Sequence, residues 1–229
     1  SALEKIFKRE KINYVAHLAA KTDTRSSVKE VLEHEAVNIA GTLNLLELAV
    51  GSKVKKFVFT SSSSVYGNNA KPPFKETEVT DFPLAPYGAT KKAAEVLAHT
   101  YYFNHNLPIV CLRLFNAYGE RMRPGLVLHK WTENILKGKP IEMSGTGKRK
   151  RDFTYVGDVV SSIVKALDAK VGFEIINIGN SKPVSLVELL KIVEKVIGQR
   201  AKVRQRKSTR PSVELTHANT NKAPRLLHW

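Results

Sequence analysis

The chain has 229 residues, of which 42% are hydrophobic, and this is enough for one substantial globular domain with a small appendage. Its single cysteine, Cys111, excludes an intramolecular disulfide. No run is apolar and long enough to cross a membrane and no signal-peptide pattern opens the chain, so we expect a cytoplasmic protein. The formal net charge is +16, but the basic residues are scattered and lack interleaved aromatic side chains. This favours a solvated surface with a pocket for anionic ligands over nucleic-acid binding.

Apolar periodicity predicts alternating helices and strands in the first half of the chain. The predicted helices cover residues 1–10, 28–50 and 87–104, and the predicted strands cover residues 13–19, 56–61 and 109–114. Strands that alternate with helices form parallel sheets with crossover helices. We therefore expect an α/β fold in which residues 13–19 form a buried strand.

The pattern becomes mixed after Gly119. Helices are predicted at residues 126–137, 157–168 and 185–197, and short strands at residues 141–143, 153–156, 173–178 and 203–207. Ser185, followed three residues later by Glu188, predicts a capping box. We assign residues 1–119 to a main domain and residues 120–229 mostly to a second lobe, with residues 153–180 returning to the main sheet.

The predicted helix at residues 87–104 begins with Tyr87 and carries Lys91 one turn later. This spacing puts a phenol and an ammonium on one face of the helix. A phenol with a pKa of about 10 is a poor base at neutral pH, and a nearby cation brings its pKa closer to the range that a general base needs. The same pattern also occurs by chance on surface helices, so its neighbours decide how it is interpreted.

Two predicted strands end in polar residues and glycine turns on either side of this helix in the sequence. The first ends in a block of hydroxyls at residues 60–64, and the second runs into Asn116 and Gly119. Open α/β sheets place their ligands at such strand ends. A serine of the first strand end could therefore hydrogen-bond the same substrate hydroxyl as Tyr87.

At these residues the chain resembles the extended short-chain dehydrogenase/reductases, and within them the nucleotide-sugar epimerases that act on UDP-glucuronate or UDP-galactose. The resemblance is carried, in order, by residues 17–20, 61–67, 87–91, 112–119 and 151–156. It implies a Rossmann-like, doubly wound parallel sheet, incomplete at its N-terminal side, with a small C-terminal α/β lobe for the substrate. It also implies NAD as the cofactor and a nucleotide-diphosphate sugar, typically a UDP-sugar, as the substrate.

The resemblance implies roles for individual residues. Tyr87 would be the acid/base, Lys91 its tuning cation and ribose ligand, and Ser62 the catalytic hydroxyl, although four serines run together and the register could slip by one. Further cofactor contacts are implied at Leu18, Ala19, Ala20, Lys21, Asn38, Thr60 and Phe115, and for Asn38 a structural hydrogen bond to the backbone is an equal alternative. Substrate contacts are implied at Ser63, Ser64, Asn116, Arg123, Val127, Arg151 and Arg210.

The reaction that the resemblance implies is NAD-dependent epimerisation at C4 through a transient 4-keto sugar. Individual residues help to distinguish it from related reactions. Ser63 and Ser64 stand where dehydratase relatives carry an Asp-Glu pair, and decarboxylase relatives carry a glutamate at the second position. Two hydroxyls leave no acid for elimination. Arg123 resembles an arginine near the sugar carboxylate of glucuronate epimerases, but residues 123–126 read Arg-Pro-Gly-Leu where that subgroup has Arg-Pro-Asp-Met. The sugar pair therefore stays open between glucose/galactose and glucuronate/galacturonate.

The glycine-rich turn with which the family's dinucleotide site begins is not found in these residues. Either a glycine-rich segment exists that this sequence does not record, or the chain is a fragment that cannot bind the dinucleotide in the usual way. A related reductase or dehydratase, and a non-catalytic fragment that binds a sugar nucleotide or nucleic acid, stay open as alternatives. The family's homodimers pair two helices from each subunit, for which residues 28–50 and 87–104 are candidates. No metal, nucleic-acid or membrane partner is expected.

Overall fold

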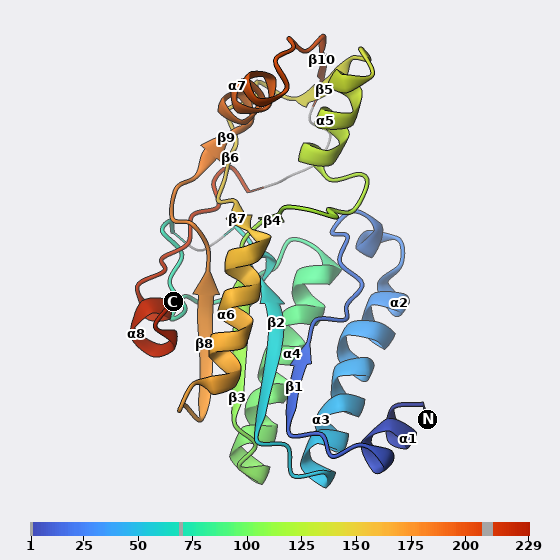
Figure 1. The fold of residues 1–229 in the computed structure, drawn as a ribbon, viewed down its shortest axis with the longest axis vertical. Helices are drawn as coiled ribbons and strands as arrows, with labels where there is room; N and C mark the ends of the chain where they lie inside the picture. Colours follow the sequence, from blue (N-terminus) through green and yellow to red (C-terminus); the bar gives the residue numbers. More distant parts are fainter. Residues whose placement is uncertain (1, 69–70, 208–212) are drawn as a thin grey trace.

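The main domain contains a four-stranded parallel sheet with the strand order β1-β2-β3-β8 (Figure 1). The computed structural model describes residues 2–68, 71–207 and 213–229. The strands of this sheet are β1 (Tyr14–His17), β2 (Lys56–Ser62), β3 (Ile109–Leu114) and β8 (Phe173–Ile178). In the register of the sheet, Phe59 of β2 lies opposite His17 on one side and Cys111 on the other. Because all four strands are parallel, their carboxyl ends meet at one edge.

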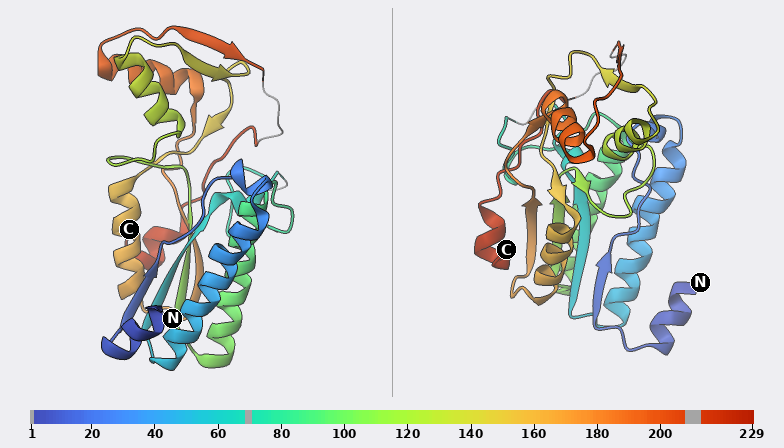
Figure 2. Two further views of the ribbon diagram at one scale, coloured as in Figure 1. Left: turned by 90° about the vertical axis from the view of Figure 1, so that its right-hand side faces the viewer. Right: turned by 45° about the horizontal axis from the view of Figure 1, so that its top comes forward.

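Helices cover both faces of the sheet, as Figures 1 and 2 show. One face carries α2 (Val31–Glu35), the π-helical turn η2 (Ala36–Ala40), α3 (Gly41–Gly51) and α4 (Pro86–His105), and the other carries α6 (Val156–Asp168) and α8 (Lys222–Leu227). Successive side chains of a strand point to opposite faces. Phe57 and Phe59 accordingly pack in the core beneath α3 and α4, whereas Val58 packs beneath α6. The predicted doubly wound α/β fold is confirmed.

β1 lies at the edge of the sheet, and the expectation of a buried strand at residues 13–19 is wrong. Tyr14 is 51% exposed, and Leu18, directly after the strand, is 53% exposed. β1 pairs with β2 on one side, and no other strand in the described part of the chain pairs with it. A parallel strand is fully buried only where neighbours and helices cover it on all sides. The helix α1 (Ala2–Arg9) precedes β1, and Phe7 packs against the core on the α3 side.

The second lobe has its own small core. Its elements are α5 (Val127–Leu136), β5 (Ile141–Ser144), α7 (Leu186–Ile197) and β10 (Val203–Arg206), and β10 pairs in parallel with β5. Trp131, Ile141 and Leu189 are buried between these elements. The predicted capping box at the start of α7 is confirmed, because the Glu188 amide donates to Ser185 Oγ at 3.1 Å and Glu188 Oε2 accepts from the Ser185 amide at 2.8 Å.

Short elements connect the lobe to the sheet, and the sequence did not predict most of them. They are η1 (Ser26–Val28), η3 (Ser63–Tyr66), the parallel pair β4 (Ala117–Tyr118) and β7 (Thr154–Tyr155), and the antiparallel pair β6 (Lys150–Arg151) and β9 (Val184–Ser185). Elements of two to four residues are too short to show periodicity. The end of the chain also returns to the main sheet, where α8 packs beneath α6 and Trp229 Nε1 donates to the Asp158 carbonyl at 2.9 Å. None of the described helices is long and apolar enough to span a membrane.

Candidate active site

The first two turns of α4 bring Tyr87 and Lys91 to the carboxyl end of β2. The helix starts at Pro86, whose fixed backbone angle and missing N–H suit a first helical position. Lys91 Nζ donates a 2.7 Å hydrogen bond to the Thr60 carbonyl, near the end of β2, and stands 4.7 Å from the Phe59 ring centroid. Tyr87 is 9% exposed and Lys91 2%. Both side chains therefore face the sheet rather than solvent.

The strand register decides which serine faces the tyrosine. Ser61 Oγ points into the core and donates to Glu95 Oε1 at 2.5 Å. Ser62 is the hydrogen-bonding neighbour of the Tyr87 phenol, and its Oγ also accepts from the Ser64 amide at 3.1 Å. Because the amide uses a lone pair of Ser62 Oγ, the hydroxyl proton stays available for donation. The structure thus brings together Ser62, Tyr87 and Lys91, the three residues to which the resemblance assigns catalytic roles.

The environment shifts the pKa values of both titratable groups. Burial raises the pKa of the Tyr87 phenol, whereas Ser62 and the charge of Arg123 lower it. Arg123 is thus a cation whose charge acts on the phenol pKa, and the role of Lys91 as the tuning cation stays a prediction. Burial lowers the pKa of Lys91 to about 8, against raising effects from Cys111 and Glu95. Lys91 is therefore still mostly protonated at neutral pH.

A buried polar network lies behind this site, and the sequence analysis missed it. Arg113 donates to Glu95 from Nε at 2.9 Å and from Nη2 at 2.8 Å, and its guanidinium stacks 4.8 Å from the Tyr66 ring. Glu95 also holds Ser61, so the network fixes the end of β2 against α4. The helical spacing could have indicated that Glu95 belongs to this network, because Glu95 follows Lys91 by four residues and lies on the same face of the helix.

The segment after β1 runs past the same strand ends. Leu18 and Ala19 are exposed there and Ala20 is half-buried. Asn38 is 1% exposed and fixes the backbone of Lys21, accepting from its amide at 2.8 Å and donating to its carbonyl at 3.0 Å. The side chain of Lys21 pairs with Glu30 at 2.9 Å and also with Glu33. In this structure Asn38 and Lys21 therefore shape the segment, which is the structural role that the sequence left open for Asn38.

Three further residues at the strand ends were predicted to contact ligands, namely Thr60, Phe115 and Asn116. Thr60 Oγ1 donates to the His17 carbonyl at 3.0 Å, so Thr60 ties β2 to β1. Phe115 is 0% exposed, with its ring centroid 6.2 Å from that of Tyr66 and 6.3 Å from that of Phe74. Protein atoms cover this ring in the structure, and the expected contact of Phe115 with a cofactor stays a prediction. Asn116, the next residue, is exposed.

The predicted substrate-side residues lie on the segments between sheet and lobe. Ser63 and Ser64 are half-buried in η3, and Val127 is the first residue of α5. Arg123 lies on the exposed segment between β4 and α5, with Nη2 3.9 Å from Asp23 Oδ2. Arg210 lies outside the described residues.

Arg151 is a half-buried cation. It lies in β6, and its Nη1 donates to the carbonyls of Lys150 at 2.8 Å and Glu214 at 3.5 Å. Burial, and then the neighbouring charge of Arg149, lower the pKa of Arg151. A guanidinium in such surroundings is stabilised by an anionic ligand such as a phosphate.

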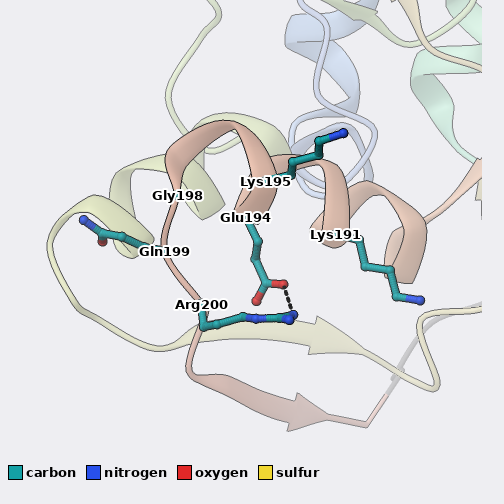
Figure 3. Close-up of a pocket in the computed structure, with 6 residues that line it drawn as sticks. All are labelled: Lys191, Glu194, Lys195, Gly198, Gln199 and Arg200. Atoms are coloured by element: carbon teal, nitrogen blue, oxygen red, sulfur yellow. Dashed lines mark hydrogen bonds and ion pairs between the residues drawn. The ribbon is translucent and has the colours of Figure 1, made fainter.

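The hollow drawn in Figure 3 is not part of this site. It lies in the small lobe and is lined by Lys191, Glu194, Lys195, Gly198, Gln199 and Arg200. Arg200 pairs there with Glu194 at 3.1 Å. No group of three His, Cys, Asp or Glu side chains in residues 2–68, 71–207 and 213–229 is arranged to hold a metal ion. We therefore place the candidate active site at the strand ends around Tyr87.

Comparison with known proteins shows the family. The model of the NAD dependent epimerase/dehydratase family matches residues 1–179. The chain belongs to this family. A UDP-glucuronate 4-epimerase of Thermodesulfobacterium geofontis is 40% identical over 229 residues, which are 100% of this chain and 70% of that relative. UDP-glucuronate 4-epimerase 4 of Arabidopsis thaliana is 39% identical over 99% of this chain and 56% of its own length.

Solved structures of epimerases share the fold. The UDP-glucose 4-epimerase of Thermotoga maritima with UDP-glucose superposes with a TM-score of 0.95 at 32% identity, covering 100% of this chain and 75% of that one. The UDP-glucuronic acid 4-epimerase of Bacillus cereus in complex with UDP-glucuronic acid and NAD gives a TM-score of 0.92 at 36% identity, covering 100% of this chain and 73% of that one. The chain thus corresponds to roughly three-quarters of these two epimerases and to a little over half of the plant relative.

Proposed function

We propose that this protein is an NAD-dependent nucleotide-sugar 4-epimerase that interconverts UDP-glucose and UDP-galactose, or UDP-glucuronate and UDP-galacturonate. The observation that carries the proposal is the grouping of Ser62, Tyr87 and buried Lys91 at the end of β2. A phenol with a hydroxyl donor beside it and an ammonium one helical turn away suits proton exchange with a sugar alcohol. Relatives named as UDP-glucuronate and UDP-glucose 4-epimerases support the same reaction.

The described residues fit the nicotinamide end of NAD. An ammonium has three N–H donors, and the Thr60 carbonyl is the one hydrogen-bond acceptor of Lys91 in the described part of the chain. The other donors suit the diol of the nicotinamide ribose. Leu18 and Ala19 offer exposed apolar surface beside the same strand ends. NAD held there would supply a reversible hydride acceptor for C4 of the sugar.

The chain's own residues would handle the proton and the substrate. Tyr87, as phenolate, removes the proton of the C4 hydroxyl, and Ser62 donates a hydrogen bond to the C4 oxygen. The 4-keto sugar then turns about its phosphate linkage, and Tyr87 returns the proton on the other face, which inverts C4. Ser63 and Ser64 supply hydroxyls but no carboxyl group, so the site lacks an acid there to eliminate water. Arg151 would pair with the diphosphate, assisted by Arg210, so the nucleotide part supplies the binding energy.

Product analysis tests this proposal against its alternatives. The full chain is incubated with NAD in three separate reactions, which contain UDP-glucose, UDP-galactose or UDP-glucuronate. The products are separated by anion-exchange chromatography. An epimerase interconverts one pair of sugars without net formation of NADH. In a parallel incubation with NADH in place of NAD, net consumption of NADH would indicate a reductase. A product lighter by one water in either incubation would indicate a dehydratase. Binding of UDP-sugar in a calorimeter with no product at all would favour the non-catalytic fragment.

We also propose a homodimer that pairs the helices beside the active site. Phe103 and Val96 of α4 are 76% and 52% exposed, and Leu32 of the adjacent α2 is 81% exposed. Large apolar side chains exposed on neighbouring helices are typical of an interface between subunits. Light scattering should give twice the chain mass, and Phe103→Lys should give the monomer. A monomer at all concentrations of the wild-type protein would contradict this.

A further inference from the structure

Asp23 and Arg123, a hundred residues apart in sequence, face each other beside the candidate active site. Asp23 lies in the segment after β1, and Arg123 lies in the segment between β4 and α5. Arg123 Nη2 stands 3.9 Å from Asp23 Oδ2. The charge of Arg123 also acts on the Tyr87 phenol. The pair therefore stands within electrostatic reach of the phenol that we assign to proton exchange.

The Asp23 carboxylate is held in place by its own backbone. Its Oδ1 accepts from the Arg25 amide at 2.7 Å and from the Ser26 amide at 3.3 Å. Burial raises the pKa of Asp23, but these two amides and the charges of Arg123 and Arg25 outweigh it and lower the pKa overall. Oδ2 is thus the oxygen left to face Arg123. Because the side chains of Arg123 and Asp23 are 49% and 41% exposed, a ligand can reach both.

We propose that Asp23 is a specificity-determining residue that makes the site prefer a neutral hexose over a sugar acid. The inference rests on the proposed function and extends it to the choice of sugar. A sugar carboxylate that approaches Tyr87 needs a cation, and Arg123 is a half-exposed cation whose charge reaches the phenol. A fixed aspartate at Arg123 neutralises that cation and repels a second carboxylate. A neutral sugar meets no such repulsion.

The test is a comparison of two ligands by isothermal titration calorimetry. UDP-glucose and UDP-glucuronate share the nucleotide and diphosphate and differ at C6, where one has a hydroxyl group and the other a carboxylate. The key variant is Asp23→Asn, because an asparagine keeps the Oδ1 that accepts from the Arg25 and Ser26 amides while losing the charge. The matched control is Asp168→Asn, an exposed aspartate at the end of α6, where the helix is far from the carboxyl ends of the strands.

The wild-type protein should bind UDP-glucose more tightly than UDP-glucuronate. Asp23→Asn should improve the affinity for UDP-glucuronate by about threefold to fivefold, the size expected for a half-exposed charge pair. Its affinity for UDP-glucose should stay unchanged, and Asp168→Asn should change neither. The double variant Asp23→Asn with Arg123→Gln should lose the gain, because the freed cation is then removed. The gain should also shrink at high salt.

The outcomes separate this inference from the function on which it rests. If both ligands bind and Asp23→Asn leaves the ratio of their affinities unchanged, the inference is overturned and the proposed function stands. A wild-type preference for UDP-glucuronate overturns it as well. If neither UDP-sugar binds to the wild-type protein, the proposed function itself is overturned, and the inference is overturned with it.

Discussion

Glu95 and Arg113 form a bidentate ion pair in the interior of the protein, with side chains that are 1% and 2% exposed. Removing one partner of such a pair leaves a buried charge without compensation. We therefore expect Glu95→Gln to lower the free energy of unfolding by about 3–5 kcal/mol, measured by urea denaturation. The control is Glu133→Gln, which breaks the exposed pair with Lys137 on α5 and should leave the midpoint unchanged. Equal midpoints for both variants would contradict the importance of the buried pair.

The low pKa of Lys91 predicts how activity depends on pH. Burial lowers it to about 8, so the ammonium loses its proton as the pH rises through this value. Turnover should therefore fall on the alkaline side, with a midpoint near pH 8. Lys91→Arg keeps its charge in this range, so it should move that midpoint to higher pH. The comparison requires that the variant keeps the wild-type melting temperature, which shows that it is folded. An unmoved midpoint would show that another group titrates there.

His17 predicts a loss of stability in acid. Burial, and then the charge of Lys91, lower its pKa from 6.5 to about 4, and it hydrogen-bonds Thr42 at 2.9 Å. Between these two values the unfolded chain binds a proton that the folded protein does not, so stability falls as the pH falls from 6.5 to 4. His17→Gln should reduce this slope by up to about 1.4 kcal/mol per pH unit, as measured by urea denaturation. His105→Gln, at the end of α4, is the control that removes another histidine, and equal slopes in both variants would refute the assignment.

Gly88 is expected to be required for the approach of α4 to η3. A Cβ atom at this position would stand 2.6 Å from the Ser64 carbonyl oxygen and 3.0 Å from Pro83 Cβ. Gly88→Ala should therefore push the first turn of α4 away and lower both activity and melting temperature. Gly51→Ala at the end of α3 is the matched control, because no heavy atom lies within 4 Å of its added Cβ. Wild-type activity in Gly88→Ala would show that the two segments need not be in close contact.

The sequence predicts those parts of the fold that depend on local patterns. The bounds of β3 and β8 agree with the predicted strands, and the capping box at Ser185 starts α7 as expected. Apolar periodicity and caps act over a few residues and can be recognised in one chain. The structure also places Ser62, at the end of β2, beside Tyr87 in the first turn of α4, two positions that the ends of predicted elements indicated.

The features that the sequence did not predict depend on contacts between distant residues. The exposure of β1 depends on which strands flank it, and its apolar sequence carries no such information. The sequence does not distinguish Phe115 from an exposed aromatic residue at a strand end. Its burial becomes visible only when Tyr66 and Phe74 are seen to pack against it. The pairs Glu95–Arg113 and Asp23–Arg123 join segments whose positions are set by the whole fold.

The role of Tyr87 is the centre of this account, and one comparison of turnover tests it most directly. Tyr87→Phe and Tyr101→Phe remove a phenol hydroxyl from the same helix, and Tyr101 bonds only Glu47 among the described hydrogen-bond partners. Both are assayed with NAD and the UDP-sugar that the wild-type protein converts. We predict that Tyr87→Phe loses at least about a hundredfold in turnover while its affinity for the UDP-sugar is kept, and that Tyr101→Phe matches the wild type. Wild-type turnover by Tyr87→Phe would contradict the account.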